Sequence, residues 1–85
     1  MNITHSLIEV LPGVYVEPSD VQSVRDTLVF DKTWQHFVVV ELRKPEGTEQ
    51  VRKFCKDYAE VTLLIEKAVN AINTELRQRR LESKS

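Results

Sequence analysis

Hydrophobic residues in the first part of the chain form short runs that proline and glycine interrupt. The β-prone segment at residues 7–11 stops at Pro12 and Gly13, a pair typical of a turn. Val14, Tyr15 and Val16 follow and again favour a strand, which Pro18 ends. The pattern therefore predicts a β-hairpin across the Pro12-Gly13 turn.

The segment after Pro18 has two interpretations. Ser19 as an N-cap would begin a short helix with Val21, Val24 and Leu28 on one face, because they are spaced by 3 and 4. Alternatively, one turn leads into a strand over residues 24–30. We favour the strand, because residues 27–30 are rich in β-branched, aromatic and other apolar side chains.

Residues 34–42 form the clearest predicted strand. Four consecutive apolar residues at 37–40 leave no polar position, which is typical of a strand covered on both faces. Lys44, Pro45, Glu46 and Gly47 then indicate a turn.

Residues 48–56 also have two interpretations. In the first, residues 48–54 return as a strand, and Asp57 caps a helix with Glu60 completing a capping box. In the second, Thr48 caps one long helix over 49–80, supported by apolar positions that alternate by 3 and 4. That helix would be about 48 Å long, more than a domain of this size can cover. We favour the hairpin followed by the helix.

Both interpretations predict a C-terminal helix over residues 58–80. One stripe of this helix is apolar: Val61, Leu64, Ile65, Ala68, Val69, Ile72 and Leu76. Leu63 falls outside the stripe, and residues 82–85 are expected to fray. The fold class predicted is α+β: a single domain over 1–85 in which an antiparallel sheet of three to five strands packs against this amphipathic helix.

An 85-residue domain has a thin core, which disulfides, metals or partner chains often supplement. Cys55 is the single cysteine, which excludes an intrachain disulfide and a cysteine-ligated zinc. A sheet packed on one helix also leaves apolar surface open. We therefore expect a homo-oligomer.

Twelve basic and 13 acidic residues give a net charge near zero, so no long-range attraction to nucleic acid or to membranes is expected. The first residues contain no basic stretch followed by an apolar one, and no apolar run is long enough to span a membrane. With one unpaired cysteine, these features favour the cytoplasm.

The chain shows no pattern typical of an enzyme. Cys55 has no base paired with it by spacing, and the two histidines, His5 and His36, have no ligand partners at metal-binding distances in the sequence. The carboxylates are typical of solvated turns and faces, and Gly13 and Gly47 each occupy a turn rather than a phosphate-binding loop. We expect no catalytic residues, no cofactor and no metal.

Two basic clusters make nucleic-acid binding the alternative function. One follows the predicted hairpin and comprises Arg43, Lys44, Arg52, Lys53 and Lys56; the other is at the helix end and comprises Arg77, Arg79 and Arg80. A β-ribbon can enter a major groove. Acidic residues among these positions and the balanced net charge favour a protein partner instead.

Candidate interface residues are large apolar side chains, since aromatic residues at the edge of a thin core often anchor partner contacts. They are Trp34, Phe37, Leu63, Leu76 and Leu81.

The residue pattern of segment 13–24 resembles that of many short bacterial and phage proteins. So does the pattern of residues 38–42 followed by a glycine turn and a helix. In these proteins a few antiparallel strands precede one C-terminal helix. The resemblance implies that fold and a bacterial or phage setting. The function expected is therefore a small non-enzymatic interaction module, such as an accessory regulator that binds a host or partner protein.

Overall fold

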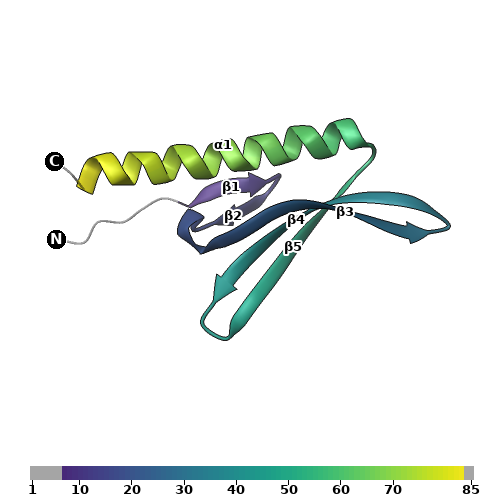
Figure 1. Cartoon of the computed structure of the whole chain (residues 1–85), viewed down its shortest axis with the longest axis horizontal. Coiled ribbons are helices and arrows are strands. Elements are labelled where there is room, and N and C mark those ends of the chain that lie inside the picture. The colour runs from purple at the N-terminus through teal and green to yellow at the C-terminus, as the bar shows by residue number, and fades with distance from the viewer. Residues whose placement is uncertain (1–6, 84–85) are drawn as a thin grey trace.

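The computed structural model describes residues 7–83, which form five strands and one long helix (Figure 1). The chain begins with the hairpin β1 (Ile8–Leu11) and β2 (Val14–Val16) and the single-turn 3-10 helix η1 (Pro18–Asp20). It continues through β3 (Val21–Asp31), β4 (Thr33–Lys44) and β5 (Gly47–Cys55), and ends with the helix α1 (Tyr58–Ser83).

The predicted first hairpin is confirmed. β1 and β2 pair antiparallel across Pro12 and Gly13. Gly13 has φ +79°, a conformation that glycine adopts without steric cost, and its N–H donates to Glu9 Oε2 at 3.0 Å. The hairpin forms a two-stranded sheet of its own, separate from the second sheet.

The favoured turn and strand after Pro18 are also confirmed, although the strand starts earlier than residue 24. Glu17, rather than Ser19, caps η1: its carboxylate accepts the N–H and the hydroxyl of Ser19 at 2.8 and 2.9 Å. The strand β3 then begins at Val21 and has a bulge before Ser23.

β4 is the central strand of the second sheet, which has the order β3-β4-β5. Val38, Val39 and Val40 are at most 2% exposed, so the mid-strand side chains are buried on both faces of β4, as the apolar run predicts. Val38 and Val40 contribute to the hydrophobic core with Leu42, on the face that α1 and the first hairpin cover. Val39 lies on the opposite face, which we call the open face.

Residues 48–54 are a strand, so the long-helix interpretation is wrong. β5 pairs with β4 from Lys44 opposite Gly47 to His36 opposite Cys55, with no irregularity. This register places Val51 opposite Val40 and Cys55 opposite His36, on the core side of the sheet. In the strand, the backbone of β5 pairs with β4 and Cys55 is buried.

The predicted helix start is confirmed. Asp57 Oδ1 accepts the N–H of Glu60 at 2.9 Å, and the Glu60 carboxylate reaches back to the N–H of Lys56 at 3.3 Å. In a standard capping box the N3 side chain bonds the N-cap residue itself, so this one is displaced by one residue. The helix continues through Ser83, three residues beyond the predicted end; residues 84–85 lie outside the described residues, as does His5.

The resulting molecule is long and thin. Its principal extents are 54 × 29 × 18 Å, and its radius of gyration is 14.7 Å. A compact chain of this length has a radius of gyration of about 12 Å. The elongation leaves a large surface for a small core, and it explains why many apolar side chains remain exposed.

Candidate interaction surface

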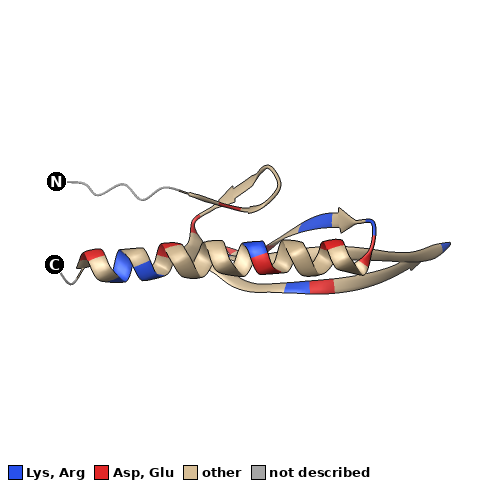
Figure 2. Ribbon diagram, turned by 90° about the horizontal axis from the view of Figure 1, so that it is seen from above, with Lys and Arg blue, Asp and Glu red and all other residues tan. Residues whose placement is uncertain are grey.

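The two flanks of α1 have different surroundings. Val61, Leu64 and Ala68 point into the core. The first hairpin covers one flank, where Ile8 and Val10 border hollows that Ala71 and Leu64 also line. In the view along the sheet from above, this hairpin lies on one side of the helix and part of the β3–β4 ribbon lies on the other (Figure 2).

No strand of the described chain covers the other flank in the same way. The helical period places five apolar residues on this flank, which we call the open flank: Tyr58, Ile65, Val69, Ile72 and Leu76. Ile65 and Ile72 are half-buried against the core, Val69 is 39% exposed and Tyr58 is 63% exposed. The spacings of 7, 4, 3 and 4 are those of a packing seam between helices.

The β3–β4 hairpin extends beyond the start of the helix and carries exposed apolar side chains at its end. Leu28, Phe30 and Trp34 are 54, 62 and 65% exposed, and we call them the aromatic tip. Phe30 lies directly opposite Trp34 in the register, and their ring centroids are 5.2 Å apart. Cross-strand aromatic pairs of this kind stabilise a hairpin end.

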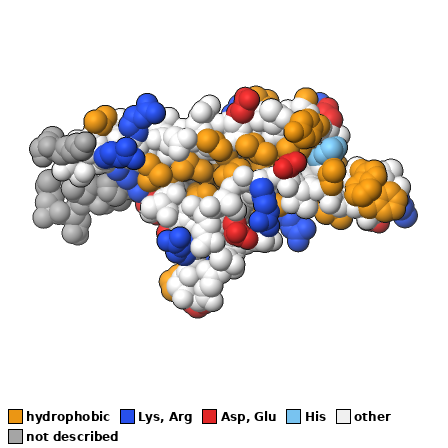
Figure 3. All heavy atoms as spheres, viewed as in Figure 1, with side chains coloured by type: hydrophobic (Ala, Val, Ile, Leu, Met, Phe, Trp, Pro, Cys, Tyr) orange, Lys and Arg blue, Asp and Glu red, His pale blue; other side chains and the backbone are white. Residues whose placement is uncertain are grey.

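His36 connects the tip to the helix. It lies opposite Leu28 in the sheet, and its ring is 6.3 Å from the ring of Tyr58 at the start of α1. The aromatic tip and the open flank thus meet at this contact. In the space-filling view, hydrophobic side chains follow the long axis of the molecule from the helix to the far hairpin end (Figure 3). We call the two together the apolar band.

Only two of the predicted interface residues lie on this band, near its opposite ends. Trp34 belongs to the tip and Leu76 to the open flank. Leu63 and Leu81 are exposed on the outward face of the helix, five turns apart, and Phe37 lies on the open face against Phe54, with ring centroids 5.7 Å apart. Sequence reasoning missed Leu28, Phe30 and Tyr58, whose apolar character was visible but whose common face depends on the hairpin register.

The basic residues of the predicted hairpin cluster do not form one surface. Arg43 and Arg52 lie on the open face, because their cross-strand partners Thr48 and Val39 lie there. Lys44 and Lys53 point to the opposite side, as the strand period requires. On the open face, Glu41 lies 3.8 Å from Arg25 and accepts hydrogen bonds from Ser23 and Gln50, which reduces the positive charge of that face.

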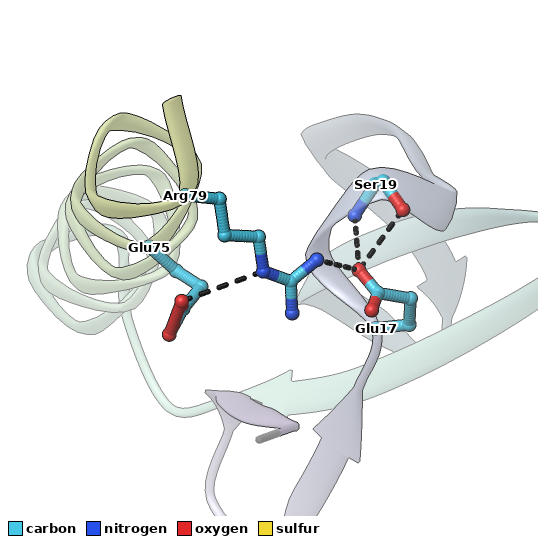
Figure 4. Close-up of polar contacts among 4 residues, drawn as sticks. All are labelled: Glu17, Ser19, Glu75 and Arg79. Carbon is cyan, nitrogen blue, oxygen red and sulfur yellow. Dashed lines mark hydrogen bonds and ion pairs between the residues drawn. The ribbon is translucent and has the colours of Figure 1, made fainter. Parts of the chain in front are cut away.

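The second basic cluster is also divided. The guanidinium of Arg79 is 2.7 Å from Glu17 and 3.4 Å from Glu75 (Figure 4), whereas Arg77 and Arg80 are exposed. The hydrogen bond from Arg79, together with those from Ser19, lowers the pKa of Glu17 from 4.5 to about 2. Arg79 therefore fixes the helix to the segment before η1 and is held away from a ligand.

Cys55 is 1% exposed and its thiol donates to the carbonyl oxygen of Lys53 at 3.7 Å. Burial, together with the neighbouring Glu60, raises the pKa of the thiol, which disfavours the reactive thiolate. Among residues 7–83, no three histidine, cysteine or carboxylate side chains cluster as a metal site would require. Within the same range, no helical segment combines the length and the hydrophobicity of a membrane span.

Comparison of the chain with protein-family models, with curated proteins and with solved structures finds no match.

Proposed function

We propose that this chain is a non-enzymatic protein-interaction module that acts as a homodimer, in which the apolar bands of two copies pack together. The single observation that carries the proposal is the joining of the open flank and the aromatic tip through His36 and Tyr58. Contiguous apolar surface of this extent on a soluble chain marks an interaction site.

The band is large enough for a specific interface. An aromatic side chain can bury about 150–250 Å². Tyr58, Phe30 and Trp34 are each almost two-thirds exposed, so together they leave roughly 400 Å² uncovered in each copy. Two copies, with Leu28 and the aliphatic residues of the open flank added, approach the 1,200 Å² or so at which stable interfaces begin.

The geometry of the band suits a second copy. A two-fold dimer uses the same surface of both chains. The open flank is a straight seam on a helix of about 39 Å, so the open flanks of two copies can pack against each other with their helices parallel or antiparallel. Packing against a second copy would also enlarge the buried core, which is thin for this chain length. Covering the apolar band in this way would bring the share of buried apolar surface in the assembly towards that of ordinary domains.

The regulatory setting is part of the same proposal. A small dimer in the cytoplasm of a bacterium or phage-infected cell, acting by occupying a partner protein, is consistent with the balanced charge and the buried, unreactive thiol. Nucleic-acid binding has weaker support, because the basic residues are divided between faces and Arg79 is paired with Glu17.

Sedimentation equilibrium over a concentration series tests the proposal with two matched variants. Val69→Glu places a carboxylate on the band, whereas Leu63→Glu makes the same change at an exposed apolar position on the outward helix face. We expect the unmodified chain and Leu63→Glu to be dimers and Val69→Glu to be a monomer with an unchanged circular dichroism spectrum. A monomeric unmodified chain at high micromolar concentration, or equal dissociation of both variants, would contradict the proposal.

A further inference from the structure

The outer edge of β5 is a second surface, separate from the apolar band. β5 is an edge strand of its sheet, and nine residues pair with β4 without a bulge or a proline. Natural edge strands are usually shortened, bulged or covered, because their free backbone groups can pair with another chain. β3, the other edge strand of this sheet, is irregular near Val21. β5 is therefore the regular edge of the two.

The hairpin geometry identifies the backbone groups that face outward. Pro45 and Glu46 form a two-residue turn between Lys44 and Gly47, which are opposite each other. In such a hairpin the pair next to the turn exchanges both hydrogen bonds, and the pairs then alternate along the ladder. The N–H and C=O groups of alternate residues consequently point away from β4: Thr48, Gln50, Arg52 and Phe54.

These backbone groups have no backbone partner in the described part of the chain. Outside the helices and paired strands, the backbone hydrogen bonds there join Asp20 to Glu17 and Val61 to Asp57. The side chains of the four outward residues lie on the open face, opposite Arg43, Glu41, Val39 and Phe37. An incoming strand would therefore meet Arg52 and the half-exposed ring of Phe54 side by side.

The second half of β5 and the residue that follows it carry positive charge. Arg52 lies on the open face and Lys53 on the core side, and Lys56 follows the strand; no carboxylate occurs in residues 50–56. An added strand places alternate side chains on both faces, so it would meet Arg52 on one face and Lys53 on the other. Carboxylates at these positions would complement both cations.

We infer that the outer edge of β5 binds an extended acidic peptide segment of a partner protein by strand addition. The outward backbone groups of β5 include both N–H donors and C=O acceptors. The backbone of a second peptide strand can form hydrogen bonds with both kinds in turn. A nucleic-acid strand offers phosphate acceptors but no matching series of donors for the carbonyl groups. This inference does not depend on the homodimer, because the band involves α1 and the β3–β4 hairpin end.

The probe is a short fluorescein-labelled peptide of alternating threonine and glutamate, whose binding is followed by fluorescence anisotropy. The same peptide with lysine in place of glutamate is the charge control, and oligothymidylate of similar length is the nucleic-acid control. We expect the acidic peptide to bind at least about tenfold more tightly than either control. On ¹⁵N-labelled protein, we expect the largest amide shifts at Thr48, Gln50, Arg52 and Phe54.

Two variants and one control locate the contact. Gln50→Pro removes one outward N–H without removing a backbone hydrogen bond to β4, since proline is tolerated at such edge positions. It also removes the side-chain hydrogen bond from Gln50 to Glu41. Arg52→Glu reverses one charge, and Arg77→Glu makes the same reversal on the exposed helix surface. We expect both edge variants to weaken binding about tenfold, with Arg77→Glu unchanged.

Three results would overturn the inference: equal binding of the acidic and basic peptides, preferential binding of oligothymidylate, or undiminished binding by Gln50→Pro. Amide shifts confined to the open flank or the aromatic tip would also overturn it, since they would assign the peptide to the band. Sedimentation of the same samples reports the dimer independently. Loss of peptide binding with an intact dimer would therefore leave the proposed function standing.

Discussion

Glu17 Oε2 lies 2.7 Å from Arg79 Nη1, a contact between residues separated by 62 positions in the chain. The arginine side chain is 15% exposed and also lies 3.4 Å from Glu75, one helical turn earlier. The same Glu17 oxygen accepts both hydrogen bonds from Ser19 (Figure 4). One carboxylate thus caps η1 and fixes the distal half of α1 over the first hairpin.

We predict that Glu17→Gln lowers the free energy of unfolding by about 1–2 kcal/mol at pH 7. The pKa of Glu17 is lowered from 4.5 to about 2 by folding, so its ionised form stabilises the folded state above pH 4.5. This contribution is lost as the pH falls from 4.5 towards 2. The partial exposure of the carboxylate reduces the magnitude below that of a fully buried pair.

Urea unfolding of both proteins at pH 7, 4.5 and 2, at one protein concentration, measures this difference. The two curves are expected to converge as the pH approaches 2. Glu66→Gln, the same change at an exposed position on α1, is the control and is expected to change stability by less than about 0.5 kcal/mol. A difference between the Glu17 proteins that stayed constant down to pH 2 would assign the effect to something other than ionisation.

Local signals were sufficient to predict most of the elements. Pro12 and Gly13 marked the first turn, and Asp57 with Glu60 marked the helix start. The ambiguity at residues 48–56 arose because Val51 and Phe54 happen to continue the helical spacing of the residues that follow. Length resolved it correctly, since one helix over both segments would extend beyond anything it could pack against.

The candidate surface was less predictable, for physical reasons that particular residues illustrate. Arg79 belonged to a basic cluster in the sequence, but its partner Glu17 is 62 residues away and no local pattern connects them. Phe30 and Trp34 share a face only because the β3–β4 register pairs them. The open flank exists because the first hairpin packs on the other side of the helix, which depends on the path of the chain after Pro18.

We predict that Asp57→Ala destabilises the fold by about 1 kcal/mol. The carboxylate accepts the N–H of Glu60 at 2.9 Å, and alanine would leave that helix-terminal donor without its side-chain acceptor. Asp57→Asn keeps an acceptor oxygen at the same place and is expected to cost only a few tenths of a kcal/mol. Midpoints of urea unfolding distinguish the two, and equal losses would show that charge rather than capping determines the effect.

We predict opposite effects for two exposed lysine-to-glycine changes. Lys32 joins β3 to β4 with φ +67°, a conformation that costs about 1–2 kcal/mol for residues with a Cβ atom. Lys32→Gly should therefore stabilise the protein, by about 0.5–1 kcal/mol after the greater chain entropy of glycine is subtracted. Lys67→Gly lies within α1 and should destabilise it by about 1 kcal/mol. Thermal unfolding of both variants tests the sign, and a loss for Lys32→Gly would refute the strain argument.

Trp34 is the only tryptophan of the chain, so its fluorescence reports directly on the aromatic tip. In one copy its side chain is 65% exposed, and the proposed dimer would cover it. We predict that dilution through the dissociation range shifts the Trp34 emission to longer wavelength and increases its quenching by iodide, because the indole becomes hydrated. Val69→Glu should show the long-wavelength emission at all concentrations, whereas Leu63→Glu should follow the unmodified chain. Emission independent of concentration in a protein that sedimentation shows to dimerise would exclude the tip from the interface and confine it to the open flank.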